Sequence, residues 1–127
     1  MRRIALIAHD GKKQEMLDLV RCYLDVIVDS ELVATGTTGA LVSDEFGITV
    51  ERMASGPLGG DLQVGARVVS GDVDLVIFLR DPLAAHPHEP DIQALMKICD
   101  VHCVPLATNM ATAALCLNAR VAAVAPV

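Results

Sequence analysis

Three glycines and a proline stand within the seven residues 55–61, SGPLGGD. Such a composition interrupts regular structure and lets the backbone approach a ligand closely. Because the stretch leads into a helical pattern, it leaves backbone N–H groups free to bind an anion. Asp61, at the end of the stretch, would then hold a carboxylate beside that anion, where it could act as a base. The alternative is that Asp61 only caps its helix, as Asp often does at such positions.

Hydroxyl groups, free N–H groups and a lysine indicate that this anion is a phosphate. The run 35–38, Thr-Gly-Thr-Thr, offers hydroxyl and N–H donors at the start of a helix, and the next loop offers the same. Lys13 lies one turn into an earlier helix and could add a point charge. The alternative for each residue alone is an ordinary helix cap or a solvated lysine. The predicted phosphate-binding residues are Lys13, Thr35, Gly36, Thr37, Thr38, Ser55 and Gly56.

Carboxyl and imidazole groups gather in the same kind of loop. Those that follow predicted strands are Asp10, Asp61, Asp81, Asp91, His9, His86 and His88. Carboxylates brought together in a partly dry site shift one another's pKa values, so that one becomes a base and another shares the proton. A base beside a polarised carbonyl can remove a proton from the adjacent carbon, while a histidine N–H holds the enolate oxygen that forms. Phosphate on the next carbon could then leave.

Structural roles are the alternatives for several of these residues. Asp91 suits a helix N-cap, Asp81 suits the start of a turn, and His86 suits a solvated loop. His102 falls in a predicted strand, which favours a structural role. No serine stands in a GxSxG motif, no cysteine stands near a helix start with a base beside it, and GxGxxG is absent. A covalent nucleophile and a dinucleotide cofactor are therefore not expected.

The four cysteines show no CxxC pair, so we expect them to be reduced and mostly buried, as is typical of a cytoplasmic protein. A zinc site built from Cys99, His102 and Cys103 is the alternative. The segment is predicted as a helix end and a buried strand, which disfavours that alternative. No metal site is therefore predicted.

Apolar runs of strand length alternate with helical patterns along the chain. The predicted strands are 4–8, 31–34, 48–53, 75–79 and 101–106. The predicted helices are 12–24, 40–46, 62–70, 91–99 and 110–118. The tail 120–127 is predicted as a last strand or as a segment that faces a partner.

This alternation predicts one α/β domain over residues 1–127. We expect a three-layer sandwich around a five-stranded, mainly parallel, doubly wound sheet of the Rossmann-like type. The polar loops described above, together with Thr108 and Asn109, all follow strands. Such loops meet at the carboxyl edge of an open α/β sheet, where ligands bind.

Composition narrows the classes of function. The 127 residues fit one domain, and 53% of them are hydrophobic, which is enough to fill a core. The net charge of −6 and the lack of a basic run argue against a nucleic-acid partner. No apolar run approaches the roughly 18 residues that a membrane span needs. Residues 1–8 could pass for a short signal peptide, but HDGKK at 9–13 interrupts the apolar run too soon.

Six short motifs follow one another along the chain. They are IAHD at 7–10 with Lys13, ATGTTG at 34–39, SGPLGGD at 55–61 with QVG at 63–65, DPL at 81–83, PH and PD at 87–91, and ATN at 107–109. With these motifs the chain resembles the bacterial methylglyoxal synthase family over about residues 4–114. The resemblance implies an enzyme that converts dihydroxyacetone phosphate to methylglyoxal and inorganic phosphate without a metal or an organic cofactor.

The same resemblance implies roles for the residues in these motifs. Asp61 matches the catalytic base, and His88 matches the histidine that contacts the substrate oxygens. His9 and Asp91 match residues that line the site, with Asp10 and Asp81 close by; the phosphate-binding positions are those named above. Members of the family are typically cytoplasmic homohexamers, and phosphate often inhibits them cooperatively.

A binding module is the second hypothesis. The same fold serves as a small-molecule sensing domain within larger synthetases, and such a domain could keep the phosphate loops while losing Asp61, His88 and Asp91. All three residues are present here. The tail ends soon after Arg120, whereas some family members carry a longer basic segment near the site, so a role for an arginine of that segment is unassigned.

Overall fold

One parallel sheet organises the chain, for which the computed structural model describes residues 3–124. Its strands are β1 (Arg3–Ala8), β2 (Glu31–Ala34), β3 (Glu51–Arg52), β4 (Leu75–Leu79) and β5 (Leu106–Ala107). They lie in the order β3-β2-β1-β4-β5, and every neighbouring pair is parallel. The predicted α/β fold is confirmed, and the sheet is parallel throughout rather than mainly.

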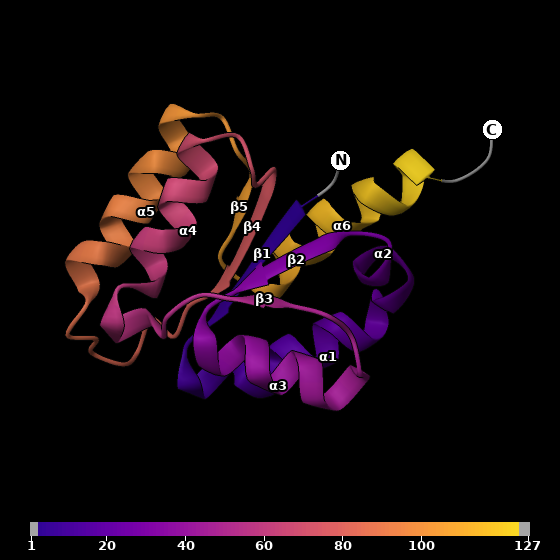
Figure 1. Ribbon diagram of the computed structural model, residues 1–127, viewed down its shortest axis with the longest axis horizontal. Helices are drawn as coiled ribbons and strands as arrows, with labels where there is room; N and C mark the ends of the chain where they lie inside the picture. Colours follow the sequence, from indigo (N-terminus) through magenta and orange to yellow (C-terminus); the bar gives the residue numbers. More distant parts are fainter. Residues whose placement is uncertain (1–2, 125–127) are drawn as a thin grey trace.

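Helices cover both faces of the sheet (Figure 1). They are α1 (Lys13–Cys22), α2 (Leu24–Val28), α3 (Gly36–Phe46), α4 (Gly60–Val69), α5 (Glu89–Val101) and α6 (Met110–Val124), with short 3₁₀ turns η1 (Asp10–Lys12) and η2 (Gly56–Leu58). Alternate residues of β1 enter two separate cores: Ile4, Leu6 and Ala8 pack with α1, α2, α3 and α6, whereas Ala5 and Ile7 pack with α4 and α5. The result is a three-layer sandwich, because successive side chains of a strand point to opposite faces.

The third helix begins four residues earlier than predicted. The stretch 36–39 is the first turn of α3 and not a loop, and Gly39 is buried within it. A Cβ on Gly39 would lie 2.8 Å from Cγ of Arg52 in β3. This glycine therefore serves the close approach of α3 to the sheet, which its composition alone does not distinguish from a turn. The helix ends at Gly47, whose φ of 64° is the predicted left-handed C-cap.

The fifth strand was predicted wrongly. Val101 is the last residue of α5, and His102 is its C-cap rather than a strand residue. Cys103 follows with a φ of 54°, so the chain turns sharply there and only Leu106–Ala107 joins the sheet. Strand β3 is likewise two residues long instead of six. Both are edge strands, where pairing on one side only leaves less to fix the extended conformation.

The end of the chain is helical where a strand was one of two predictions. Helix α6 continues to Val124, beyond the predicted end at 118. The strand prediction for 120–127 is therefore wrong as far as 124, and the rest of that segment lies outside the described residues. No helix in the described range is long and apolar enough to cross a membrane.

The cysteines are more exposed than predicted. Cys99 is buried, but Cys22 and Cys103 are exposed and Cys116 is partly exposed, and all four are free thiols. Because His102 and Cys103 are both exposed beside a buried Cys99, these three residues do not converge. Within residues 3–124, no group of three or more His, Cys, Asp or Glu side chains is arranged to hold a metal ion.

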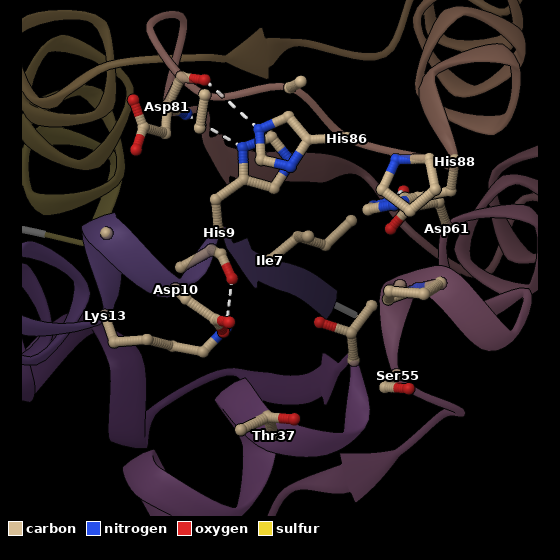
Figure 2. A pocket seen from close by; sticks show the side chains of 18 residues that line it. Ile7, His9, Asp10, Lys13, Thr37, Ser55, Asp61, Asp81, His86 and His88 are labelled. Carbon is tan, nitrogen blue, oxygen red and sulfur yellow. Dashed lines mark hydrogen bonds and ion pairs between the residues drawn. The ribbon is translucent and has the colours of Figure 1, made fainter.

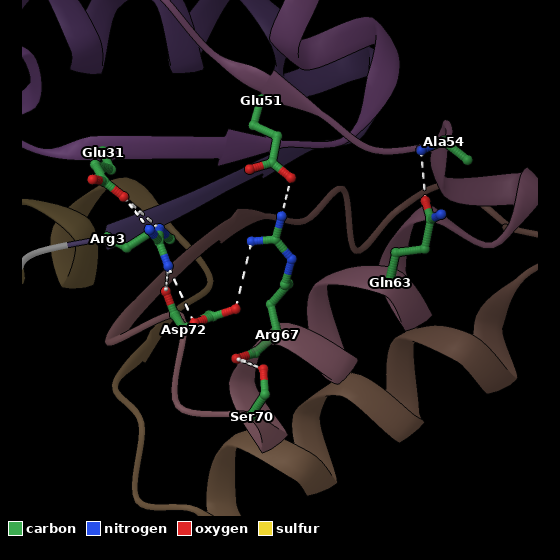
Figure 3. A network of polar contacts seen from close by, with 8 residues as sticks. All are labelled: Arg3, Glu31, Glu51, Ala54, Gln63, Arg67, Ser70 and Asp72. Carbon is green, nitrogen blue, oxygen red and sulfur yellow. Dashed lines mark hydrogen bonds and ion pairs between the residues drawn. The ribbon is translucent and has the colours of Figure 1, made fainter.

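Ion pairs tie together the sheet edge that lies away from the candidate site (Figure 3). Arg3 at the start of β1 donates from Nε to Glu31 at the start of β2, at 2.8 Å, and pairs with Asp72 at 3.3 Å. Arg67 of α4 pairs with Glu51 of β3. These contacts fix the amino ends of the strands, so the carboxyl ends carry the loops that remain for binding.

Candidate active site

A cavity of about 360 Å³ opens at the carboxyl ends of β1 and β4, the central strands of the sheet. The order of strands reverses direction between these two, and ligands bind at such a point in open α/β sheets. Loops that follow β1, β2, β3 and β4 line this cavity, which we call the central pocket (Figure 2). The predicted site residues that line it are His9, Asp10, Lys13, Thr35, Thr37, Ser55, Gly56, Asp61, Asp81 and His88.

Three predicted site residues do not line the central pocket but lie against residues that do. The buried hydroxyl of Thr38 accepts a hydrogen bond from the Ala8 N–H at 3.2 Å. Gly36 donates its N–H to the Ala54 carbonyl at 3.2 Å, which joins the start of α3 to the loop after β3. Asp91 is in the first turn of α5. The N-cap of this helix is His88, so the prediction that Asp91 caps it is wrong.

Lys13 is held by polar contacts on two sides. Its ammonium group donates to the Ala8 carbonyl and, at 3.2 Å, to the Thr38 hydroxyl. The Asp10 carboxylate, which is fully exposed, lies 3.7 Å away. Burial lowers the pKa of Lys13, and the neighbouring Asp10 acts in the opposite direction. The first residue of α1 thus places a cation at the wall of the central pocket.

Hydroxyl groups and a helix start face this cation across the central pocket. Thr35 is the N-cap of α3, and Thr37 lies in the first turn of that helix. The N–H groups of a first helical turn have no partners within the helix, and the helix dipole favours an anion there. Ser55 occupies the corresponding position before η2. The side chains of Thr37, Ser55 and Lys13 surround one part of the central pocket in Figure 2.

Tight backbone packing places Asp61. Gly59 is the N-cap of α4 with a φ of 96°, a left-handed conformation that suits glycine. A Cβ on Gly60 would lie 1.9 Å from the Ala54 carbonyl oxygen, so no other residue fits without moving the backbone. Asp61 is the second residue of α4 and makes no capping hydrogen bond. The alternative in which Asp61 serves only as a helix cap is therefore wrong.

The environment of Asp61 is that of a functional carboxyl group. Its side chain is fully buried, and neither carboxylate oxygen has a hydrogen-bond partner among the described residues. Burial raises the pKa of Asp61, opposed in part by His88, while Asp91 raises it further. His88 Nε2 lies 3.5 Å from Oδ2. Burying an unpaired carboxylate costs free energy, and such groups concentrate at functional sites.

Gly56 keeps the space between Asp61 and His88 open. A Cβ at this position would lie 3.0 Å from His88 Nε2 and 3.4 Å from Asp61 Oδ1. Any side chain would therefore occupy the region that both functional groups face. The glycine was predicted as a phosphate-binding residue, and the structure places it next to Asp61 and His88.

His9 is a neutral donor at the floor of the central pocket. Its Nδ1 accepts a hydrogen bond from the Asp81 N–H at 2.9 Å, so the ring proton is on Nε2. That Nε2 is buried and has no partner within the described part of the chain. Burial first, and then His86 and His88, lower the pKa of His9 to about 4. At neutral pH the ring is uncharged and can donate a hydrogen bond to a ligand.

The sequence placed His86 among the imidazoles of the strand-end loops, with a solvated loop residue as the alternative. That alternative is wrong: His86 lines the central pocket, and its ring stacks on His9 with centroids 3.6 Å apart and planes at 21°. The available signal was its spacing, since His86 and His88 alternate in the loop that follows the buried strand β4.

Thr108 and Asn109 do not reach the central pocket. They line a neighbouring cavity together with Lys12 and Arg80. His86 also borders this neighbouring cavity.

The assembled groups suit one kind of chemistry. A buried carboxylate and a neutral imidazole lie beside a lysine and two helix starts in the same cavity. The carboxylate and the imidazole can remove and hold a proton, and the lysine and the helix starts can bind a phosphate dianion. The site is therefore equipped for proton abstraction from a carbon of a small phosphate ester.

Comparison with known proteins gives one consistent answer. The model of the MGS-like domain family matches residues 15–108. Methylglyoxal synthase of Carboxydothermus hydrogenoformans is 56% identical over 119 residues, which cover 94% of this chain and 98% of that protein. Methylglyoxal synthase of Thermus thermophilus is 58% identical over 113 residues, which cover 89% of this chain and 90% of that protein. The crystal structure of methylglyoxal synthase from Elizabethkingia anophelis superposes with a TM-score of 0.86 at 41% identity, covering 91% of this chain and 76% of that chain.

Proposed function

Because the chain belongs to the methylglyoxal synthase family, we propose that it is a carbon–oxygen lyase that converts dihydroxyacetone phosphate to methylglyoxal and inorganic phosphate. The observation that carries this proposal is the buried, unpartnered carboxyl group of Asp61 in the same pocket as Lys13 and Thr35. A phosphate ester whose phosphate is held by Lys13 and Thr35 would present its carbon atoms to the carboxyl group of Asp61.

Asp61 is the general base of the proposed reaction. Its carboxylate takes a proton from the hydroxymethyl carbon, and the electron pair moves into an enediolate. Burial that raises the pKa of Asp61 strengthens it as a base. His88, 3.5 Å from the same carboxyl group, contacts the substrate oxygens and balances the charge that Asp61 carries. Asp91 acts through Asp61 from outside the central pocket, because a nearby negative charge raises the pKa of the base.

The neutral His9 supports the negative oxygen that forms. Its Nε2–H donates to the carbonyl oxygen of the substrate, and this bond strengthens as the enediolate develops. Because the pKa of His9 is about 4, its ring is not positively charged at neutral pH and does not give a proton to that oxygen. The negative charge therefore stays available for the next step.

Phosphate leaves in that next step. The enediolate electrons expel it from the methylene carbon as the C–O bond breaks, and the proton of the terminal hydroxyl passes to the departing phosphate. The enolate of methylglyoxal remains and takes up a proton on the former methylene carbon. This elimination requires the breaking C–O bond to stand perpendicular to the enediolate plane, and orientation of this kind supplies several kcal/mol or more. Lys13, the start of α3 at Thr35 and Thr37, and the turn at Ser55 and Gly56 fix the phosphate and thereby the torsion, while the Thr38 hydroxyl holds Lys13 from behind. Asp10 and Asp81 complete the polar wall.

The assembly and its regulation belong to the same proposal. We infer a cytoplasmic homohexamer in which inorganic phosphate, the product, also inhibits the enzyme. No metal and no organic cofactor takes part in the steps above. The site provides a base, a donor and a phosphate clamp from its own side chains.

Incubation of the purified chain with dihydroxyacetone phosphate tests the proposal. We expect methylglyoxal and inorganic phosphate to appear in equal amounts, because each elimination yields one of each. Calorimetry with the same ligand measures binding and so tests the alternative, a domain that binds the ligand without converting it. Binding with no turnover would contradict the proposal and favour a regulatory domain of the same fold.

A further inference from the structure

Two histidine rings are anchored on the backbone of one residue, Asp81. The Asp81 N–H donates to Nδ1 of His9 at 2.9 Å, and the Asp81 carbonyl lies 3.2 Å from Nε2 of His86. A carbonyl oxygen only accepts, so Nε2 of His86 is the donor in this contact. The two imidazoles, held by the N–H and the carbonyl of this residue, stack on each other (Figure 2).

The stack encloses the ring of His9. Phe78 of β4 meets that ring edge-on, with centroids 5.1 Å apart at 75°. His86 covers one of its faces at 3.6 Å. With Nδ1 bonded to Asp81, the remaining direction is that of Nε2, which faces the central pocket. The ring is therefore fixed by a contact at its edge, a contact at its face and one hydrogen bond.

His86 also separates two cavities. It borders the central pocket on one side and the neighbouring cavity, lined by Lys12 and Arg80, on the other. That cavity measures about 590 Å³. Without the His86 ring, water in the neighbouring cavity would reach the face of His9.

We propose that His86 is a positioning residue, whose ring shields the His9 imidazole from water and holds its Nε2–H toward the substrate. Nothing in the motifs that define the site assigns a role to this side chain. The inference rests on the proposed function for its kinetic consequence, whereas its structural part stands on the stack itself.

Several charged groups determine the protonation of His9. Burial is the largest cause of its low pKa, followed by His86, His88, Arg80 and Lys13, all of which disfavour a second positive charge. The carboxyl groups of the central pocket, which would favour the charged ring, are Asp10, Asp61 and Asp81. Loss of the His86 ring removes both shielding and one of the groups that disfavour the charged form. The pKa of His9 then rises from about 4 toward its ordinary value of 6.5.

Titration of the imidazoles by nitrogen-15 NMR on the full chain tests the structural part. In the unsubstituted protein, we expect His9 to remain the Nε2–H tautomer down to nearly pH 4. In His86→Ala, the pKa of His9 should rise by at least about one unit. His86→Phe keeps a ring on His9 but loses the donor to Asp81 and the charge of His86, so the pKa of His9 should rise less than in His86→Ala.

His102→Ala is the matched control, because His102 is exposed and caps the far end of α5. It should leave His9 unchanged. An unchanged tautomer and pKa of His9 in His86→Ala would overturn the inference. So would a shift in His86→Phe as large as that in His86→Ala, since ring coverage would then not be the cause. Circular dichroism shows whether each variant is folded, and the folded phenylalanine variant decides the question if the alanine variant is not.

Kinetics with dihydroxyacetone phosphate test the consequence for catalysis. Removal of an aligned donor to a developing oxyanion lowers kcat by roughly 10²–10³, so imperfect alignment should lower kcat of His86→Ala about tenfold with little change in KM. His86→Phe should recover most of that loss. An unchanged kcat in His86→Ala would overturn the inference. If even the unsubstituted protein does not turn over, the proposed function fails, while the titration still decides whether His86 positions His9.

Discussion

At the scale of single residues, the site depends on polar groups whose burial costs free energy. Asp61 has no hydrogen-bond partner within residues 3–124, and burial raises the pKa of its carboxyl group. His9 Nε2 likewise has no partner in that range, and burial first lowers the pKa of its ring to about 4. Both groups keep their ligand-facing atoms free, which is the arrangement expected when the missing partner is a substrate.

Replacement of Asp61 by Asn should stabilise the protein at neutral pH. The carboxyl group holds its proton more tightly in the folded than in the unfolded state, because its folded pKa lies above the ordinary value of 3.8. Its favourable contribution to folding is therefore complete below that value and is lost as pH rises through the raised pKa. Chemical denaturation of both proteins between about pH 4 and pH 8 measures the difference.

The unfolding free energy of Asp61→Asn relative to the unsubstituted protein should increase as the pH rises. Asp10→Asn is the control, because Asp10 is exposed beside the same pocket and should show no such trend. A relative stability that is independent of pH would contradict the assigned environment of Asp61.

Sequence patterns located most of this site but not all of it. Lys13, Thr37, Ser55 and Asp61 could be predicted to converge because each follows a strand of a parallel sheet. His86 also follows a strand, but its stack on the ring of His9 could not be predicted from the sequence. The buried position of Thr38 behind Lys13, rather than in the central pocket, likewise follows from the packing of α3 on β1.

At the scale of elements, the site is most sensitive to changes at the start of α4. Gly60 lies against the carbonyl of Ala54, and the side-chain carbonyl of Gln63 accepts a hydrogen bond at 2.7 Å from the N–H of the same Ala54 (Figure 3). The loop after β3 and the first turn of α4 are thus one packed unit. Asp61 follows directly, so its position depends on that unit.

Gly60→Ala should disrupt both the fold and the site. A Cβ 1.9 Å from a backbone oxygen cannot be relieved by a side-chain rotation, so we expect a loss of about 1–3 kcal/mol or more in unfolding free energy. Turnover should fall as well, because Asp61 is displaced. Thermal denaturation and the turnover assay measure the two effects.

Gly65→Ala in the same helix is the matched control. Its Cβ would meet the flexible end of Ile98 at 3.0 Å, and alanine favours a helix, so the change in stability should stay within about 1 kcal/mol. Equal losses in the two variants would show that the close approach at Gly60 is not what places Asp61.

Boundaries of elements were predictable where the core decides them and not elsewhere. Strand β4 matches its predicted range because five consecutive buried residues leave no alternative. The edge strands β3 and β5 were predicted too long, since their apolar residues pack without pairing. Val101 is the last residue of α5 rather than the first of a strand, and Cys103, with a φ of 54°, turns the chain.

At the scale of the whole molecule, the net charge of −6 opposes the approach of a phosphate ester. The central pocket counters this locally with Lys13 and two helix starts. Large apolar side chains also remain at the surface: Leu58, Leu83 and Leu115 are 79%, 96% and 71% exposed. In the proposed homohexamer, other copies of the chain would cover such side chains.

Light scattering tests the proposed homohexamer. We expect a mass about six times that of one chain, independent of concentration over the micromolar range, because a closed assembly has no free interface. A mass of one chain at every concentration would contradict the hexamer. That result would leave the reaction untouched, because each residue of the proposed mechanism comes from a single chain.

The most direct test of the central claim is the rate of methylglyoxal formation by Asp61→Asn. Asparagine keeps the shape of the side chain but cannot take the proton, and a positioned carboxylate base contributes roughly 10²–10⁴-fold. We predict that kcat with dihydroxyacetone phosphate falls by at least that factor while calorimetry still detects bound phosphate. A variant that binds phosphate and forms methylglyoxal at the full rate would show that Asp61 is not the base.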